Sequence, residues 1–416
     1  MTAAPARLRA EDISLSWRTT AFILLMVFEF FYGWSWNTVD VLRPQIREEL
    51  GLTLTQAGSA YTAQSLGALI GAIVFGALAD RVGRRPVLFA IVLGTAAAAA
   101  AGAYVQSYPM LLAQRFILGI FLGANFPVLI ATYMGLIPSG VRGKLASIGQ
   151  GTYNLSVIAL GMAYGMFAER SDWHLLLLIG SVPALILSPL ILLLIPDDRK
   201  MSAWGANPDE PQSGRMPLLE LFSPELRRNT WLLFLLVALN FFAYQAFAGW
   251  TTTFLKDERG LGPETIGWIV STQFAGALIG GFFWGWFSDR YGRRPTGIGF
   301  AFGALAALAY IFVAQSPTTI AVAGFCWGFA ITASVAWAPW MSEMYPTRVR
   351  SSAMSIFNWG RIVSMTAPLV TGQIAASFGL EAAMLLGVVG FGLAAVVWFA
   401  LPETVPRRGS KTAGPS

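Results

Sequence analysis

The sequence predicts an all-α membrane protein whose twelve transmembrane helices form two pseudo-symmetric six-helix bundles. Three observations predict this fold class. Of the 416 residues, 55% are hydrophobic and only 12% are charged, whereas a soluble domain carries roughly 25% charged residues. Apolar runs of about 20 residues, the length that crosses a bilayer as a helix, recur along the whole chain. A polar motif that ends one of these runs returns half a chain later.

Each apolar run is assigned to one helix, because backbone polar groups in lipid must be satisfied within the segment itself. The 43 glycines suit helices that pack closely in a membrane. Six helices are expected in each half of the chain. The expected spans are 20–42, 57–79, 87–106, 109–136, 146–168, 173–195, 230–254, 264–287, 296–314, 318–341, 352–376 and 381–401.

The loop after the second expected helix reveals an internal repeat. The stretch Gly76–Pro86 (GALADRVGRRP) returns 209 residues later as Gly285–Pro295 (GWFSDRYGRRP). Residues 63–86 and 272–295 are identical at 13 of 24 positions, so the chain is expected to consist of two similar halves. The expected divisions are a first half at 1–195, a proline-rich cytoplasmic linker at 196–229, a second half at 230–401 and a cytoplasmic tail at 402–416.

Positive charge is distributed unevenly over the expected loops. Of the 28 Lys and Arg residues, 21 lie in the N-terminus, in the loops that follow even-numbered helices, or in the C-terminus. Because positive residues concentrate on the cytoplasmic side, both termini are expected there, in a bacterial inner membrane. The basic excess therefore reflects topology and does not indicate nucleic-acid binding. The five basic residues on the other side are Arg43, Arg47, Arg170, Lys256 and Arg259.

The sequence supports neither an enzyme nor a bound cofactor. It contains no nucleophile–base pair, no phosphate-binding loop and no cluster of metal ligands. Cys326 is the only cysteine, which excludes a disulfide within the chain. The only histidine, His174, is expected at the external end of the sixth helix, away from any central site. We expect a monomer.

The duplicated loop resembles the signature loop of the major facilitator superfamily. The first copy carries Gly76, Asp80, Gly83 and flanking arginines, and the resemblance covers essentially the whole chain. It implies transport by alternating access, with a substrate site near the midplane between the halves. It also implies that the acid of each loop meets the positive end of a helix from the opposite half. The gating candidates are Asp80, Arg81, Arg84, Asp289, Arg290 and Arg293; positive-inside topology alone is the alternative.

The first expected helix carries two acids, and acids inside a membrane are rare and mostly functional. Glu29 lies near mid-depth and Asp40 near the external end. At 100° per residue, a separation of eleven residues places the two acids within about 20° of each other. Trp36 and Arg43 share that face. Both acids are candidates for proton coupling; the alternatives are a structural Glu29 bonded to polar neighbours and an Asp40 paired with Arg43.

Arg115 is the candidate partner of Asp40. The stretch Arg115–Gly123 resembles the motif of the fourth helix in the superfamily. That resemblance implies an arginine that faces the cavity and takes part in proton transfer. We expect an Asp40–Arg115 pair that opens when substrate or a proton arrives; a permanent structural pair is the alternative.

Arg361 is the principal candidate for binding substrate. It lies near mid-depth in the eleventh expected helix, with Asn358 and Ser364 one turn away on either side. A planar guanidinium offers two parallel hydrogen bonds to a carboxylate. The second half has no acid at the depth of Arg361. This favours an anionic substrate as the partner of the guanidinium. A pair with Glu29 is the alternative.

Three stretches of the second half resemble the organic-acid:proton symporters of this superfamily. They are residues 244–255, residues 343–350 and residues 357–362. Aromatic-acid symporters carry an Asp-Gly-Tyr-Asp motif in the first helix, where this chain has Tyr32–Gly33–Trp34–Ser35. Glu29 and Asp40 are the acids that could replace it.

The internal repeat suggests further residues for the substrate site. An offset of about 208 places Tyr153 opposite Arg361 and Gln150 opposite Asn358, and Gln64 matches Gln273. Helix–helix hydrogen bonding is the alternative role of each amide. Trp337 and Trp340 are further candidates for an aromatic cage. The expected substrate-binding residues are Arg361, Asn358, Tyr153, Gln150, Asn154, Trp36, Tyr244 and Gln273.

Taken together, these residues predict a secondary transporter of a small organic anion, such as a monocarboxylate, by proton symport. Its partners would be the anion, protons and the lipid bilayer. Within transport, the alternative is a carrier of a neutral, sugar-like solute or a proton-driven exporter of hydrophobic compounds. A receptor or a channel is the alternative from another class.

Overall fold

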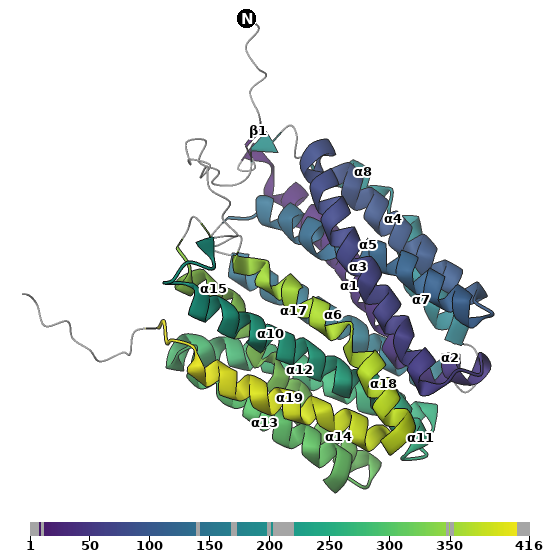
Figure 1. Ribbon diagram of the computed structural model, residues 1–416. Helices are drawn as coiled ribbons and strands as arrows, with labels where there is room; N and C mark the ends of the chain where they lie inside the picture. Colours follow the sequence, from purple (N-terminus) through teal and green to yellow (C-terminus); the bar gives the residue numbers. More distant parts are fainter. Residues whose placement is uncertain are drawn as a thin grey trace, which may run out of the picture. The chain divides into compact units, whose positions relative to one another are not determined.

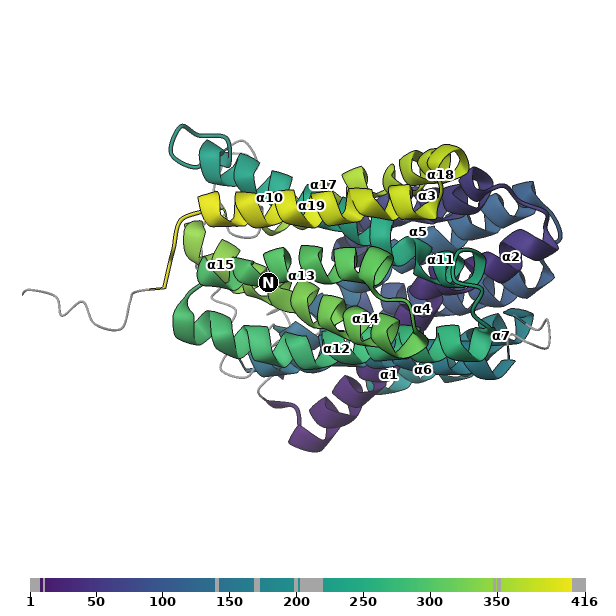
Figure 2. The same ribbon diagram turned by 90° about the horizontal axis from the view of Figure 1, so that it is seen from below.

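The computed structural model describes residues 8–9, 12–138, 142–167, 173–197, 201–202, 220–346, 349 and 353–405. These residues confirm the expected all-α fold (Figures 1 and 2). The chain divides into two compact units. The first comprises Met1–Pro211 and Thr251–Ser271, and the second comprises Gln212–Trp250 and Thr272–Ser416.

The first unit contains the helices of the first half and one short helix from further along the chain. Its elements are β1 (Leu8–Arg9), α1 (Leu15–Val41), α2 (Arg43–Glu49), α3 (Leu54–Val82), α4 (Arg84–Ala101), the 3₁₀ turn η2 (Gly102–Tyr104), α5 (Tyr108–Gly135), α6 (Arg142–Phe167), α7 (Trp173–Leu187), α8 (Leu190–Leu194), β2 (Met201–Ser202) and α11 (Thr251–Asp257). The two-residue strands β1 and β2 pair in parallel.

The second unit contains the remaining helices. They are α10 (Arg227–Phe247), η6 (Ala248–Trp250), η7 (Pro295–Gly297), α13 (Ile298–Leu308), the π-helical turn η8 (Ala309–Val313), α14 (Pro317–Ile331), η9 (Thr332–Ala336), α15 (Trp337–Met344), α17 (Ile356–Ser364), α18 (Ala367–Phe378) and α19 (Leu380–Ala400). Helix α12 (Pro263–Tyr291) is shared, because the boundary between the units falls after Ser271.

Ten helical stretches of the described residues are long and apolar enough to cross a membrane. The expected spans 146–168 and 352–376 are not among the ten, although most of their described residues are helical. The first is α6, which carries polar residues such as Gln150 and Asn154. The second is divided into α17 and α18, since Pro368 in the first turn of α18 has no N–H to continue a helix. The protein is therefore an integral, multi-pass membrane protein, with ten candidate spans among the described residues.

The internal repeat reappears as a repeated packing contact. Glycines of α3 lie directly against the backbone of α5 in the first unit, and glycines of α12 lie against α14 in the second. The contacts are Gly67 with Phe116, Gly71 with Ile120, Gly276 with Phe325 and Gly280 with Phe329. Each residue of the second set lies 209 positions after its counterpart. This close approach is the small-residue packing that joins helices in lipid.

A substitution at Gly71 tests this packing. A Cβ atom there would overlap the backbone of Ile120, whereas a Cβ at Gly76 in the same helix meets nothing within 4 Å. We expect Gly71→Val to reduce the free energy of unfolding by about 1–3 kcal/mol, as overpacking does. Gly76→Val is the matched control with the same change in helix propensity. Thermal unfolding in detergent measures both, and equal melting temperatures would contradict the proposed contact.

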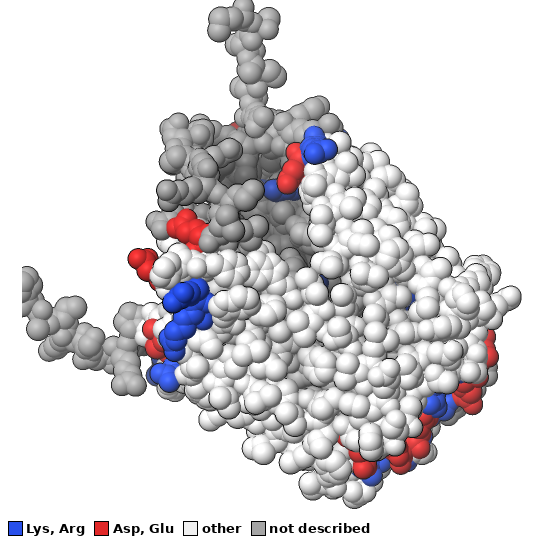
Figure 3. All heavy atoms as spheres, viewed as in Figure 1, with Lys and Arg blue, Asp and Glu red and all other residues white. Residues whose placement is uncertain are grey.

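Figure 3 shows charged side chains gathered in a few places, with most of the described surface between them uncharged. Many large apolar side chains of the helices are exposed, including Ile73, Phe282 and Val396. This distribution is typical of helices whose sides contact lipid.

Candidate functional site

Glu29 lies in the middle of α1 and is buried, with 8% of its surface exposed. Helix α1 begins after Ser14, whose side chain accepts a hydrogen bond from the backbone N–H of Trp17. Among the described residues, Oε2 of Glu29 has no hydrogen-bond partner. This oxygen therefore does not support the alternative that Glu29 is a structural acid bonded to polar neighbours. The unpartnered oxygen is an atom that could take a proton.

Asp40, near the other end of α1, forms an ion pair with Arg43. The Nη2 atom of Arg43 donates to Oδ1 of Asp40 at 2.5 Å, and both side chains are largely buried. Burial lowers the pKa of Arg43, and the Asp40 carboxylate opposes this shift. Arg115 instead donates to Oγ1 of Thr38 at 3.0 Å. The alternative of an Asp40 paired with Arg43 is therefore present in the structure, and the expected Asp40–Arg115 pair stays a prediction.

We expect Asp40→Asn to destabilise the protein. The substitution leaves the buried guanidinium of Arg43 without its counter-charge, and breaking a buried pair from one side costs about 3–5 kcal/mol. The double variant Asp40→Asn/Arg43→Met removes both charges and should recover most of the loss. Unfolding in detergent followed by tryptophan fluorescence provides the measurement. A single variant as stable as the parent protein would show that the pair contributes little.

An aromatic cluster surrounds the same helix. Tyr32 lies 6.0 Å from Trp36 and 6.2 Å from Tyr153 between ring centroids, and Trp36 packs edge-on against Tyr61 of α3. Asn37 donates from Nδ2 to the hydroxyl of Tyr153 at 2.9 Å and to the carbonyl of Gly33 at 2.7 Å. The structure therefore brings the predicted Trp36 and Tyr153 into one cluster.

Sequence reasoning did not select Asn37 or Tyr61 for this cluster. One signal was available for Asn37. It lies four residues after Gly33, so helical spacing places both residues on the same face of α1, where Asn37 donates to the carbonyl of Gly33. The other two polar candidates on α6 differ in environment, because Gln150 is exposed and Asn154 is 4% exposed.

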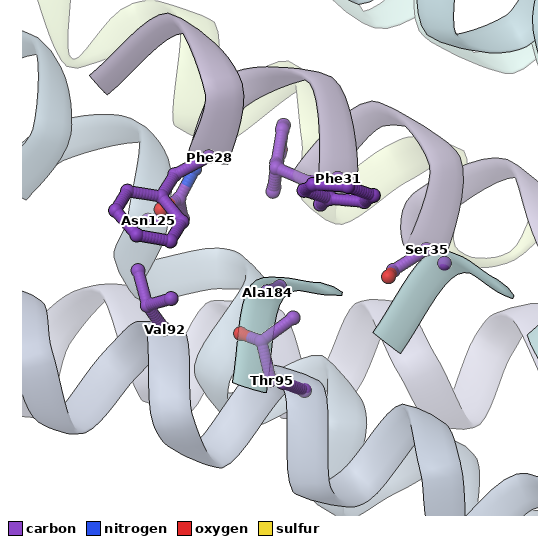
Figure 4. A pocket seen from close by; sticks show the side chains of 10 residues that line it. Phe28, Phe31, Ser35, Val92, Thr95, Asn125 and Ala184 are labelled. Carbon is purple, nitrogen blue, oxygen red and sulfur yellow. The ribbon is translucent and has the colours of Figure 1, made fainter. Parts of the chain in front are cut away.

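A small pocket beside α1 shares Tyr32 with the aromatic cluster. Figure 4 shows Phe28, Phe31 and Ser35 of α1 facing Thr95 of α4 and Asn125 of α5. Its volume of about 20 Å³ is enough for one water molecule. Asn125 is 3% exposed, and its Nδ2 atom has no hydrogen-bond partner among the described residues. A water molecule in this pocket could accept that hydrogen bond.

Arg361 lies in α17 and is half-buried. Its guanidinium carbon stands 5.6 Å from the centroid of the Phe241 ring in α10, a cation–π contact. Ser364 donates to the backbone carbonyl of Arg361 at 2.8 Å. The side chain of Asn358 lies outside the described residues. The contact with Phe241 holds the cation against an aromatic surface.

The two glutamines related by the repeat have similar environments. Gln64 in α3 and Gln273 in α12 are both buried, and Oε1 of each has no hydrogen-bond partner among the described residues. Nε2 of Gln64 donates to the backbone carbonyl of Trp36 at 3.1 Å. The matched environments agree with the repeat.

The aromatic residues of the second unit divide into two groups. Tyr244 packs on Trp327, with 5.8 Å between ring centroids. Trp337 and Trp340 are buried in the core of this unit against Trp398. The expected place of these two tryptophans in an aromatic cage is not supported, since they fill the interior of a helix bundle.

The second copy of the duplicated loop forms a network of ion pairs. Arg293 donates to Asp289 at 2.7 Å and to Glu343 of α15 at 2.7 Å. Burial lowers the pKa of Arg293, but the hydrogen bonds that Arg293 donates to Glu343 and Asp289 outweigh burial, and the pKa is raised. The carboxylate of Glu403 accepts hydrogen bonds from the backbone N–H groups of Arg293 and Arg294 at 3.0 and 2.9 Å. Arg290 stacks near the rings of Trp286 and Tyr291.

The first copy of the loop has different contacts. Asp80 and Arg81 are exposed. Arg84, the counterpart of Arg293, donates to the carbonyl of Ala131 at 2.9 Å. Gly83 and Gly292 have φ angles of 95° and 112°, values that favour glycine, so each loop needs a glycine at its turn. The expected contact of each acid with a helix of the opposite half stays a prediction.

His174 lies beside Glu49, with 3.5 Å between Nε2 and Oε1, and its ring stacks on that of Trp173. These residues belong to α7 and to the end of α2.

Known proteins resemble the chain over nearly its whole length. The model of the Major Facilitator Superfamily matches residues 25–265 and 233–416. The gallate transporter of Pseudomonas putida is 26% identical, over 88% of this chain and 88% of the relative. The 3-(3-hydroxy-phenyl)propionate transporter of Escherichia coli (strain K12) is 28% identical, over 85% of this chain and 87% of the relative.

A solved structure shares the fold. It is a bacterial homologue of the human lysosomal transporter Spinster, solved in an inward-facing and unoccupied conformation. The TM-score is 0.76 at 16% sequence identity, over 93% of this chain and 97% of the other.

Proposed function

Because this chain belongs to the Major Facilitator Superfamily, we propose that it transports small organic anions, with aromatic carboxylates as the first class to test, by proton symport and alternating access. The members of the family that it resembles are transporters, so the chain is not an enzyme. The proposed location is a bacterial inner membrane with both termini in the cytoplasm, as the distribution of Lys and Arg favours.

The guanidinium of Arg361 is the observation that carries the proposal for an anion. A permanent positive charge within a membrane helix is costly and mostly functional, and a guanidinium matches the geometry of a carboxylate. The ring of Phe241 keeps one face of this cation in place.

The relatives support an aromatic acid as the substrate. Gallate and 3-(3-hydroxy-phenyl)propionate, the substrates in their names, are aromatic carboxylates. In this proposal, Arg361 binds the carboxylate and Glu29 takes the coupled proton on Oε2. Binding of the carboxylate neutralises the charge of Arg361, and binding of the proton neutralises the charge of Glu29. Both events lower the free-energy cost of the change between the two open states, because charges inside a membrane are unfavourable.

Uptake into proteoliposomes tests the proposal. Purified full-length protein is reconstituted, an acidic outside is imposed, and accumulation of labelled 4-hydroxybenzoate, glucose and a primary amine is compared. We expect only the carboxylate to accumulate, and a protonophore to abolish the accumulation. Accumulation of glucose or the amine would favour the carrier of neutral or hydrophobic solutes. Carboxylate flux that equilibrates but never accumulates would contradict symport.

A further inference from the structure

The end of α12 carries exposed aromatic side chains that the matching end of α3 lacks. The exposed aromatic residues are Phe282, Phe283, Trp286 and Tyr291. At the 209-residue offset of the repeat, their counterparts are Ile73, Val74, Ala77 and Val82. These aliphatic counterparts are exposed as well. The same face is therefore exposed in both copies, so the need to fill the interior does not account for the aromatic residues of the second copy.

These aromatic residues and Arg290 form a stripe along the last turns of α12. Phe282, Trp286 and Arg290 are spaced four positions apart, so they share a face and follow one another by about 5.4 Å, one helical turn. The ring centroid of Trp286 lies 6.0 Å from that of Phe283 and 5.9 Å from that of Tyr291. The stripe therefore changes along the helix from apolar phenylalanine to amphipathic tryptophan and then to a cation. We call these five residues the interfacial stripe.

Arg290 contacts two rings of the stripe. Its guanidinium carbon lies 6.0 Å from the centroid of the Trp286 ring and 5.8 Å from that of the Tyr291 ring. Among the described residues, no acid forms an ion pair with Arg290, and the adjacent Asp289 pairs with Arg293 at 2.7 Å. A cation–π contact is made with the ring of the aromatic residue and uses none of the N–H donors of the guanidinium for a hydrogen bond. Arg290 can therefore donate to an anion outside the protein.

The other acids of this loop contact other groups. Glu343 pairs with Arg293 at 2.7 Å. Glu403 accepts hydrogen bonds from the backbone N–H groups of Arg293 and Arg294. These carboxylates hold the loop itself, whereas Arg290 is exposed beside the aromatic rings. The interfacial stripe thus presents a positive charge at its end.

We propose that the interfacial stripe binds an anionic phospholipid such as phosphatidylglycerol. Helix α12 is one of the candidate membrane spans, and the order of its stripe matches the depth profile of a lipid. Phe282 and Phe283 contact the acyl chains, Trp286 and Tyr291 lie at the level of the headgroup, where such residues concentrate, and Arg290 donates to the phosphate, whose geometry suits a guanidinium. The inference goes beyond the proposed transport function, because it needs only the location in a membrane.

Quenching of Trp286 by brominated lipids tests this site. Full-length protein is reconstituted in phosphatidylcholine vesicles that contain either brominated phosphatidylglycerol or brominated phosphatidylcholine, since bromine quenches tryptophan fluorescence on contact. The signal of Trp286 is the difference between the parent protein and Trp286→Phe. We expect phosphatidylglycerol to be preferred at Trp286 by about five-fold, the effect of one cation at an anionic surface. We expect Arg290→Gln to remove this preference and Arg290→Lys, which keeps the charge, to retain most of it.

Arg81→Gln is the matched control, because Arg81 is the exposed counterpart of Arg290 in the first copy of the loop. It removes the same charge and should leave the preference at Trp286 unchanged. The inference is overturned if the two lipids quench Trp286 equally in the parent protein, or if Arg290→Gln keeps the preference. Two further results would also contradict it. Displacement of the lipid by inorganic phosphate, but not by sodium chloride of equal ionic strength, would indicate a site for free phosphate. Quenching by neither lipid would indicate that a second copy of the chain or another protein covers the stripe.

Discussion

Replacement of Arg361 by glutamine is expected to reduce kcat/KM for carboxylate uptake by about 30-fold or more. Removing one partner of a buried, hydrogen-bonded charge pair costs about 2–5 kcal/mol, and each 1.36 kcal/mol corresponds to a factor of ten in rate. Glutamine keeps a polar group of similar reach in α17 but has no charge for a carboxylate. Initial rates of labelled 4-hydroxybenzoate uptake into proteoliposomes, over a range of substrate concentrations, measure the loss.

Arg361→Lys separates charge from geometry. Lysine keeps the positive charge but cannot form two parallel hydrogen bonds to one carboxylate, so we expect a loss between those of the parent and the glutamine variant. Arg259→Gln is the matched control, because Arg259 also stacks on a phenylalanine, Phe254, at 5.0 Å. Its position in the loop between α11 and α12 lies outside the proposed substrate site. Carboxylate uptake by Arg361→Gln with unchanged affinity and rate would exclude Arg361 as the anion-binding residue.

Hydropathy predicted where the helices lie, and it missed where they break. The expected span 173–195 is divided into α7 and α8 near Pro189, and the span 352–376 is divided near Pro368. Both prolines are visible in the sequence, but an apolar run reads as continuous in a bilayer even where proline removes a backbone donor. The repeat was more informative, because the glycine contacts at Gly71 and Gly280 recur at the 209-residue offset.

Within the candidate site, local spacing was a better guide than resemblance. The helical period placed Asp40 and Arg43 on one face, and these residues form the observed pair. The resemblance of α5 to a family motif suggested Arg115 as the partner of Asp40, and that pair stays a prediction.

The ion pairs between α2 and α11, which join Arg47 to Asp257 and Lys256 to Glu48, could not be predicted from the sequence alone. Arg47 and Glu48 are the counterparts of Lys256 and Asp257 at the 209-residue offset of the repeat, but this relation does not say which residues pair. Sequence reasoning did place Arg47 and Lys256 on the same side of the membrane from the positions of the loops. Pairing them correctly required the packing of α2 against α11, which is a tertiary property.

Glu29→Gln is expected to abolish proton-driven accumulation while leaving exchange of substrate across the membrane largely intact. Glutamine has the shape of a protonated glutamic acid but cannot release a proton, so the variant stays in the form that the proposed cycle reaches after protonation. Oε2 of Glu29 has no partner among the described residues, so no described hydrogen bond to this oxygen is lost. We expect the accumulation ratio to fall to about one, with counterflow reduced by less than roughly tenfold, the effect of a 1.4 kcal/mol difference.

Two comparisons make this result specific to Glu29. Asp40→Asn changes the other acid of α1, which already has an ion-pair partner in Arg43; after correction for its lower stability, it should still accumulate substrate. Gln45→Leu changes a buried polar residue of α2 that hydrogen-bonds to Tyr164 and carries no ionisable group, so the response of uptake to external pH should be preserved. If Glu29→Gln still accumulates carboxylate against its gradient with the pH dependence of the parent protein, the coupled proton does not bind at Glu29. If only Asp40→Asn loses that dependence, the proton binds at the other end of α1, and opening of the Asp40–Arg43 pair becomes the coupling step.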